Sequence, residues 1–212
     1  VHDDKGREDE IDMVIAAEHI EPEHIATMRR DAGGLLCLAI PGQVAAKLGL
    51  VYMHDMMADM GRVNPLYSKL TEGKAAYGDK PSFSISVNHR QTFTGITDSD
   101  RALTISRLAQ VCKNIESSGA DEFARDFRAP GHVPILIASR GLLAERSGHT
   151  ELCIFLTKLA GITPAVAMCE MMDSQTHKAL SIEKARDYAK RSNMTLVEAR
   201  ELKEAYQKAN VA

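Results

Sequence analysis

The chain has 212 residues, of which 44% are hydrophobic and 26% are charged, and its formal net charge is −3. This is the composition of a globular protein with a real core, and the absence of basic blocks argues against a nucleic-acid partner. No apolar stretch approaches membrane-spanning length and no signal peptide is visible, so we expect a cytoplasmic protein with no membrane partner.

The chain opens on an acidic segment, residues 3–12, with six carboxylates and two basic residues. An apolar stretch at 13–17 predicts a buried strand that anchors it. Carboxylates this close repel one another unless a cation lies among them. A solvated acidic terminus is the usual alternative, but Gly6 and Arg7 favour a site for a hard metal and a polar substrate. Because Val1 almost begins this segment, we expect a helix or strand to precede it.

Helices and strands alternate after this segment. Residues 22–32 predict a helix that ends at Gly33 and Gly34, and residues 35–40 predict a central strand. A short helix is expected at 43–49. Residues 51–82 lack clear periodicity and predict a long surface excursion that could cover a site, with its methionines interpreted as packing residues.

The middle of the chain continues this alternation. Residues 83–87 predict a half-exposed strand, and Thr97 or Asp98 is expected to cap a helix over 99–114. Residues 128–132 contain proline and glycine, which predict a tight turn before the next apolar strand, at 133–138.

The last third is mostly helical. Residues 151–160 form a periodic pattern closed by Gly161, and a buried strand at 164–168 leads into Cys169 and Glu170. Ser181 is expected to cap one helix, and Thr195 with Glu198 to form a capping box for the last. This irregular alternation predicts an α+β fold: a mixed β-sheet flanked by helices in a three-layer α/β/α arrangement, with residues 1–212 as a single domain.

The segment from Arg146 to Thr150 precedes a helix and is a candidate anion site. A helix N-terminus presents free N–H groups and partial positive charge to an anion. Arg146 can add a bidentate contact to a phosphate, and Thr150 a hydroxyl. Taken alone, a simple helix cap with an exposed arginine is the favoured alternative.

Other residues are candidates for metal binding and proton transfer. A glutamate of the acidic segment and His149, with water, would suit Mg²⁺ or Mn²⁺, whereas the ligands for structural zinc are missing. Glu170, at a strand end, is a candidate general base, with an exposed strand end as an equal alternative; His132 is equally ambiguous. The four cysteines are far apart in apolar runs, and Cys37 is expected to be an inert buried thiol.

Six ordered motifs give the sequence a specific resemblance to the 3,4-dihydroxy-2-butanone 4-phosphate synthase family of riboflavin biosynthesis, in its single-function form. They are DKGREDEID at 4–12, GGLLC at 33–37, TGITDSDRALTI at 94–105, RAPGHV at 128–133, RSGHTE at 146–151 and CEMM at 169–172. The resemblance implies a Mg²⁺-dependent lyase that converts D-ribulose 5-phosphate into L-3,4-dihydroxy-2-butanone 4-phosphate and formate.

The resemblance also assigns roles to residues. It implies that Glu8 and His149 bind the metal, Mg²⁺ or Mn²⁺ with two ions per site, and that His132 and Glu170 are essential to catalysis. The positions that match substrate-binding residues are Arg7, Glu8, Asp12, Arg146, Ser147, Gly148, His149, Thr150 and Glu170. A homodimer is implied, with the site near the subunit boundary and His132 serving the partner's site. A non-catalytic sugar-phosphate-binding module and a pentose phosphate isomerase that stops at the enediol remain as alternatives.

Overall fold

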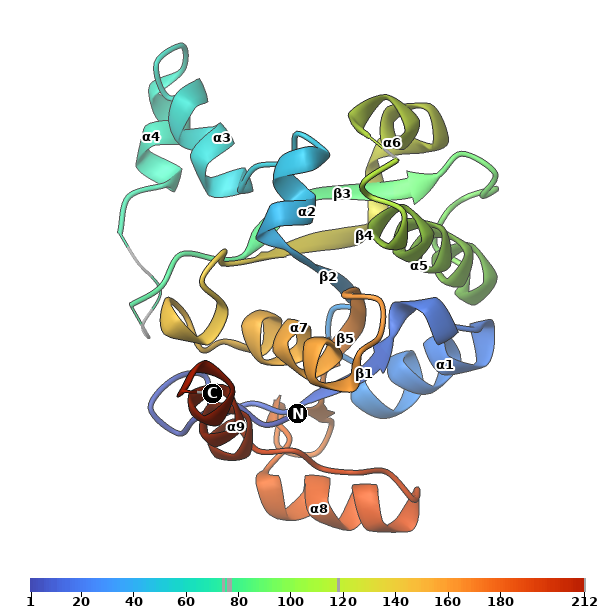
Figure 1. Ribbon diagram of the computed structural model, residues 1–212, viewed down its shortest axis with the longest axis vertical. Coiled ribbons are helices and arrows are strands. Elements are labelled where there is room, and N and C mark those ends of the chain that lie inside the picture. The colour runs from blue at the N-terminus through green and yellow to red at the C-terminus, as the bar shows by residue number, and fades with distance from the viewer. Residues whose placement is uncertain (74, 76–77, 118, 212) are drawn as a thin grey trace.

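The computed structural model describes residues 1–73, 75, 78–117 and 119–211, and these form a five-stranded sheet flanked by helices (Figure 1). The strand order is β1-β5-β2-β4-β3, and β2 and β4 are parallel whereas the other neighbours are antiparallel. The strands are β1 (Asp12–Ala16), β2 (Cys37–Pro41), β3 (Phe83–His89), β4 (Phe127–Ala138) and β5 (Val166–Glu170). The predicted mixed sheet is therefore confirmed.

The sheet separates two apolar cores. Leu38 and Ile40 of β2 point into one core, and Cys37 and Ala39 point into the other, as the pleat of a strand requires. The first core is closed by the helices α1 (Pro22–Thr27), α2 (Gly42–Lys47), α5 (Asp98–Lys113), α6 (Ala120–Asp126) and α8 (Ile182–Arg191). The second is closed by α7 (His149–Ala160) and α9 (Ala199–Val211). This is the three-layer arrangement expected from the sequence.

Several predicted helix ends are also present. The Thr97 side chain caps α5 by accepting from the Asp100 N–H, and Ser181 caps α8 in the same way through the Lys184 N–H. A π-helical turn, Met28–Ala32, continues α1 up to Gly33, whose φ of 84° ends it. In the described part of the chain, no helix is long and apolar enough to cross a bilayer.

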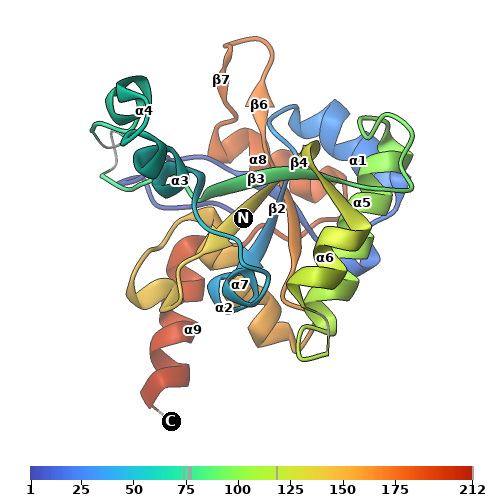
Figure 2. The ribbon, with the colours of Figure 1, turned by 90° about the horizontal axis from the view of Figure 1, so that it is seen from above.

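The excursion over 51–82 lies at the surface, as predicted, but its helices were not predicted. It contains two helices, α3 (Met53–Met60) and α4 (Pro65–Leu70), which stand out beyond β3 and bury none of their residues (Figures 1 and 2). The interpretation of its methionines as packing residues is wrong for Met53, Met56 and Met60, which are 36% to 49% exposed, whereas Met57 is partly buried. Residues 74, 76 and 77 of the excursion lie outside the described residues.

The turn predicted at 128–132 is part of β4. Val133 pairs with Val87 and Arg128 pairs with Asn88, so the four residues 129–132 have no partner on β3 and form a bulge. The proline and glycine that indicated a turn are the residues of this bulge.

The capping box predicted for the last helix is wrong. Residues 195–197 are not helical, because the Val197 carbonyl accepts from the His2 N–H at 2.9 Å. The helix α9 therefore begins at Ala199, and the Glu201 carboxylate accepts from the Glu198 N–H at 2.8 Å. A short hairpin of β6 (Met172–Asp173) and β7 (Lys178–Ala179) was not predicted either.

Candidate active site

The candidate site lies where the acidic segment meets the ends of β1 and β5 and the first turn of α7. β1 and β5 are antiparallel, and their register places Asp12 opposite Glu170. The cavity between these elements is lined by Glu8, Asp12, Arg146, His149, Thr150 and Glu170, together with Pro81, Ser82, Phe83, Leu136 and Met168. The fold thus gathers most of the predicted site residues around one cavity.

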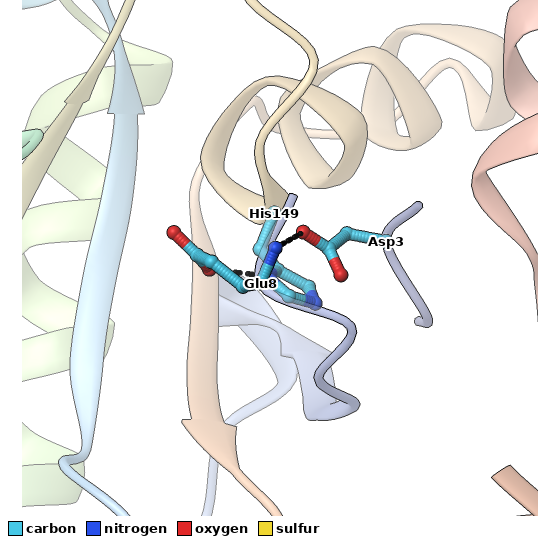
Figure 3. Close-up of side chains that lie close together, drawn as sticks. All are labelled: Asp3, Glu8 and His149. Atoms are coloured by element: carbon cyan, nitrogen blue, oxygen red, sulfur yellow. Dashed lines mark hydrogen bonds and ion pairs between the residues drawn. The ribbon is translucent and has the colours of Figure 1, made fainter. Parts of the chain in front are cut away.

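His149 is the first residue of α7 and only 6% of it is exposed. Its Nδ1 lies 3.3 Å from Glu8 Oε2, and its Nε2 lies 3.1 Å from the Glu10 carbonyl and 3.8 Å from Asp12 Oδ1. Figure 3 shows Glu8 and Asp3 on either side of the imidazole. The two residues that the resemblance assigns to the metal are therefore brought together, although 141 positions separate them in the chain.

The donor atoms around His149 fit a divalent cation. One ligand atom each from Asp3, Glu8 and His149 lies within 4.8 Å of the others. Asp12 Oδ1 is buried and has no hydrogen-bond partner among the residues that the structure describes. Carboxylate oxygens with one imidazole suit Mg²⁺ or Mn²⁺, and an unsatisfied buried carboxylate oxygen is a costly arrangement unless a cation compensates it.

Asp3 was not among the predicted site residues. Its two carboxylate oxygens accept from the backbone N–H groups of Glu8 at 3.2 Å and Glu10 at 3.1 Å. Asp3 therefore shapes the loop that carries Glu8, as an aspartate at a turn commonly does. Its place in the acidic segment was the only signal in the sequence, and that signal did not separate Asp3 from its neighbours.

Two ionisable groups of the site, Asp12 and His149, have shifted pKa values. Burial raises the pKa of the Asp12 carboxyl to about 7, and the charges of Glu170 and Glu8 act in the same direction. Burial lowers the pKa of His149, but the carboxylates of Asp12, Glu8 and Asp3 outweigh burial and raise it to about 9. The proton on His149 thus offsets the negative charge of the cluster, and a divalent cation would compete with that proton.

Glu170 is held at the end of β5 by the residues before β2. Its Oε2 accepts from the Leu35 N–H at 2.7 Å, and its carbonyl accepts from the Gly34 N–H at 3.0 Å. A Cβ on Gly34 would lie 2.5 Å from Glu170 Oε2, so only glycine allows this approach. The Gly33-Gly34 pair therefore both ends a helix and makes room for the Glu170 carboxylate.

Two arginines that match substrate-binding positions, Arg7 and Arg146, meet on one carboxylate. Arg7 Nη1 lies 2.5 Å from Asp79 Oδ2, and Arg146 Nε lies 3.4 Å from the same atom. Arg146 Nη1 also contacts the buried Glu151 carboxylate at 2.5 Å, which fixes its direction. Both guanidinium groups therefore converge beside the N-terminus of α7, which Ser147 and the N-cap Gly148 directly precede.

His132 does not line this cavity. It lies in the bulge of β4, hydrogen-bonded to Asn88, and β4 is separated from β5 by β2 in the sheet. Cys37 is buried in β2, and burial raises the pKa of its thiol, which agrees with the expected inert thiol. Of the two residues implied to be catalytic, the cavity therefore contains Glu170 alone.

Comparisons with known proteins agree over nearly the whole chain. The sequence model of the 3,4-dihydroxy-2-butanone 4-phosphate synthase family matches residues 1–205. A protein of that name from Methanothermobacter thermautotrophicus is 46% identical over 97% of this chain and 89% of its own length. One from Archaeoglobus fulgidus is 44% identical over 98% and 88%. A crystal structure of a synthase of this name in complex with two magnesium ions matches with a TM-score of 0.78 and 26% identity, over 99% of this chain and 90% of that one.

Proposed function

The chain belongs to the 3,4-dihydroxy-2-butanone 4-phosphate synthase family, and we propose that the cavity between β1, β5 and α7 is its active site. The enzyme is a Mg²⁺-dependent lyase of riboflavin biosynthesis that converts D-ribulose 5-phosphate into L-3,4-dihydroxy-2-butanone 4-phosphate and formate. The observation that carries the proposal is the approach of Glu8 to His149 at 3.3 Å beside the unsatisfied Asp12 oxygen.

We propose that Glu8 and His149 hold the metal, Mg²⁺ or Mn²⁺, with two ions per site. The donor set supports this assignment, and so does the solved relative that contains two magnesium ions. When bound, the cation polarises substrate oxygens and stabilises negative charge on them. His149 must give up its proton to bind the cation, and Asp3 holds the loop that presents Glu8.

Substrate binding is assigned to groups around the same cavity. The N–H groups that begin α7, from Ser147 to Thr150, and the guanidinium groups of Arg7 and Arg146 provide donors for the phosphate. The Asp79 carboxylate forms ion pairs with both arginines, so a phosphate must compete with Asp79 for them. A phosphate held at this end positions the reacting carbons of the sugar near Glu170 and Asp12.

Glu170 is assigned the role of general base. The reaction requires enolisation of the ketose, followed by dehydration, rearrangement and loss of formate, and each step moves protons. The Leu35 N–H holds one oxygen of Glu170, which leaves the other oxygen to take a proton from the substrate. Asp12 lies opposite Glu170 in the sheet and is placed to act as a second group in these proton transfers.

Incubation with D-ribulose 5-phosphate and Mg²⁺ is expected to release formate, and EDTA is expected to stop the release. Added Mg²⁺ in excess of the chelator should restore it, whereas added Na⁺ at the same ionic strength should not. The measurement is a coupled formate assay beside analysis of the pentose phosphates. Pentose phosphate interconversion without formate would support an isomerase, and binding without turnover with either Mg²⁺ or Mn²⁺ would support a sugar-phosphate-binding module.

We further propose a homodimer in which His132 serves the partner's site, and a cytoplasmic location. The exposed residues near the bulge of β4 support the first proposal: Phe93 is 93% exposed, and its carbonyl accepts from Arg128 of the bulged strand at 3.3 Å. Ile96 of the same loop is 51% exposed as well, and apolar patches on a surface commonly mark an interface. The cytoplasmic location is supported by the four cysteines, which are buried and free, as is usual for proteins of a reducing compartment.

A mixture of two inactive variants tests the shared site. Refolding His132→Gln together with Glu8→Gln is expected to recover activity, because one site of the mixed dimer then has both an intact Glu8 and the partner's intact His132. If His132 works in its own subunit, both sites of the mixed dimer stay inactive. Formate release after co-refolding, compared with each variant refolded alone, decides between these outcomes.

A further inference from the structure

Asn88 lies at the point where β3 parts from the bulge of β4, and only 3% of it is exposed. Its side chain makes three hydrogen bonds in the described part of the chain. Oδ1 accepts from the His132 backbone N–H at 2.8 Å, and Nδ2 lies 3.1 Å from His132 Nδ1 and 3.4 Å from the Thr94 carbonyl. Asn88 thus holds both the backbone and the ring of His132.

These contacts determine which way the amide of Asn88 faces. The His132 backbone N–H can only donate, so the amide oxygen must face it. The amide nitrogen then faces His132 Nδ1 and the Thr94 carbonyl, and it can only donate to both. His132 Nδ1 is therefore an acceptor without a proton, and the neutral ring carries its proton on Nε2.

The surrounding backbone is built closely around this side chain. Gly95 has a φ of +96°, and a Cβ there would lie 2.0 Å from Asn88 Nδ2. A Cβ on Gly131 would lie 2.0 Å from the Val87 carbonyl carbon, so the bulge packs directly on the backbone of β3. The Gly131 N–H donates to Ser86 Oγ at 3.3 Å, which ties the bulge to β3 a second time. Bulges beside active sites commonly redirect a side chain in this way.

We propose that Asn88 is a positioning residue for the reaction: it fixes His132 as the Nε2–H tautomer and directs that N–H away from Asn88, toward the substrate. The inference rests on the role of His132 in the proposed function. In this tautomer, His132 meets the sugar phosphate as a hydrogen-bond donor to an oxygen that gains negative charge. A fixed donor of this kind stabilises developing charge without reorganising during the reaction.

The substitution Asn88→Asp tests the proposal with almost no change in shape. One carboxylate oxygen can still accept from the His132 backbone N–H, but the other oxygen accepts where the amide donated, so Nδ1 is expected to gain a proton. Nitrogen NMR of ¹⁵N-histidine-labelled protein at about pH 8.5, above the range of ordinary carboxyl groups, reads the protonation of each ring nitrogen directly. His132→Gln identifies the signals of His132 by their loss.

The kinetic expectation is that Asn88→Asp lowers kcat by at least about 100-fold and leaves KM nearly unchanged. Asn64→Asp is the matched control, because Asn64 is an exposed N-cap of α4 and aspartate caps a helix equally well. It should keep wild-type kinetics and the wild-type His132 signals.

The two halves of the inference can fail separately. Wild-type enzyme with a proton on Nδ1 of neutral His132 overturns the assigned tautomer, and this measurement needs no variant to fold. Asn88→Asp with a protonated Nδ1 and full kcat overturns the positioning role. A fully active His132→Gln overturns the role of His132 in the proposed function, whatever tautomer the ring adopts.

Discussion

Replacing Glu8 by glutamine is expected to lower kcat/KM by at least about 100-fold, because the substitution removes the negative charge of a proposed metal ligand. The neutral amide keeps the size of the side chain, so the loop should retain its shape through Asp3, which binds its backbone. The affinity for Mn²⁺, measured by calorimetry without substrate, should fall by at least about tenfold.

The matched control is Glu23→Gln, which removes one negative charge from an exposed position of α1. It should leave both the kinetics and the Mn²⁺ affinity at wild-type values, apart from small long-range effects of charge. Wild-type Mn²⁺ affinity in Glu8→Gln would contradict the assignment of Glu8 as a ligand, even if the variant were inactive for another reason.

The second large effect is expected for Glu170→Gln. Loss of a general base should reduce kcat by about 10²- to 10⁴-fold, because glutamine cannot accept the proton of the substrate. Its amide oxygen can still accept from the Leu35 N–H, so the end of β5 should keep its structure. Mn²⁺ affinity should stay near that of the wild type, which distinguishes this variant from Glu8→Gln.

Glu204→Gln, on the exposed surface of α9, is the control for this second variant, since its side chain is 62% exposed. Formate release under saturating substrate measures kcat for both variants. If Glu170→Gln retains more than about a tenth of the wild-type kcat, Glu170 is not the base, and Asp12 becomes the candidate to replace next.

Elements with strong local signals were predictable. The helix α7 has an apolar stripe and ends at Gly161 in the left-handed conformation, and α5 has the threonine cap that its sequence indicated. The strands β2 and β5 are nearly continuous apolar runs, as expected for strands covered on both faces. In each case the signal is carried by residues close together in the chain.

Elements without such signals were missed. The helix α6 buries only Phe123 among its residues and α4 buries none, so neither has a clear apolar stripe. The helix α3 does have the helical spacing, in Met53, Met56, Met57 and Met60, but this run is only eight residues long and Gly61 and Pro65 follow it closely. The capping box at Thr195 was misplaced because the backbone of Val197 and Ala199 bonds to His2, far away in the sequence. Tertiary contacts of this kind override a local capping preference.

For the site, residue types and their order along the chain were sufficient to indicate a divalent-metal, sugar-phosphate enzyme and to name most of the side chains around the cavity. Their distances were decided by the tertiary structure. Glu8 meets His149 because β1 lies beside β5 and α7 packs across them, and Asn88 meets His132 across a bulge, over 44 positions in the chain. Such pairings depend on strand register and on helix packing between distant segments, and no local pattern of residues encodes either.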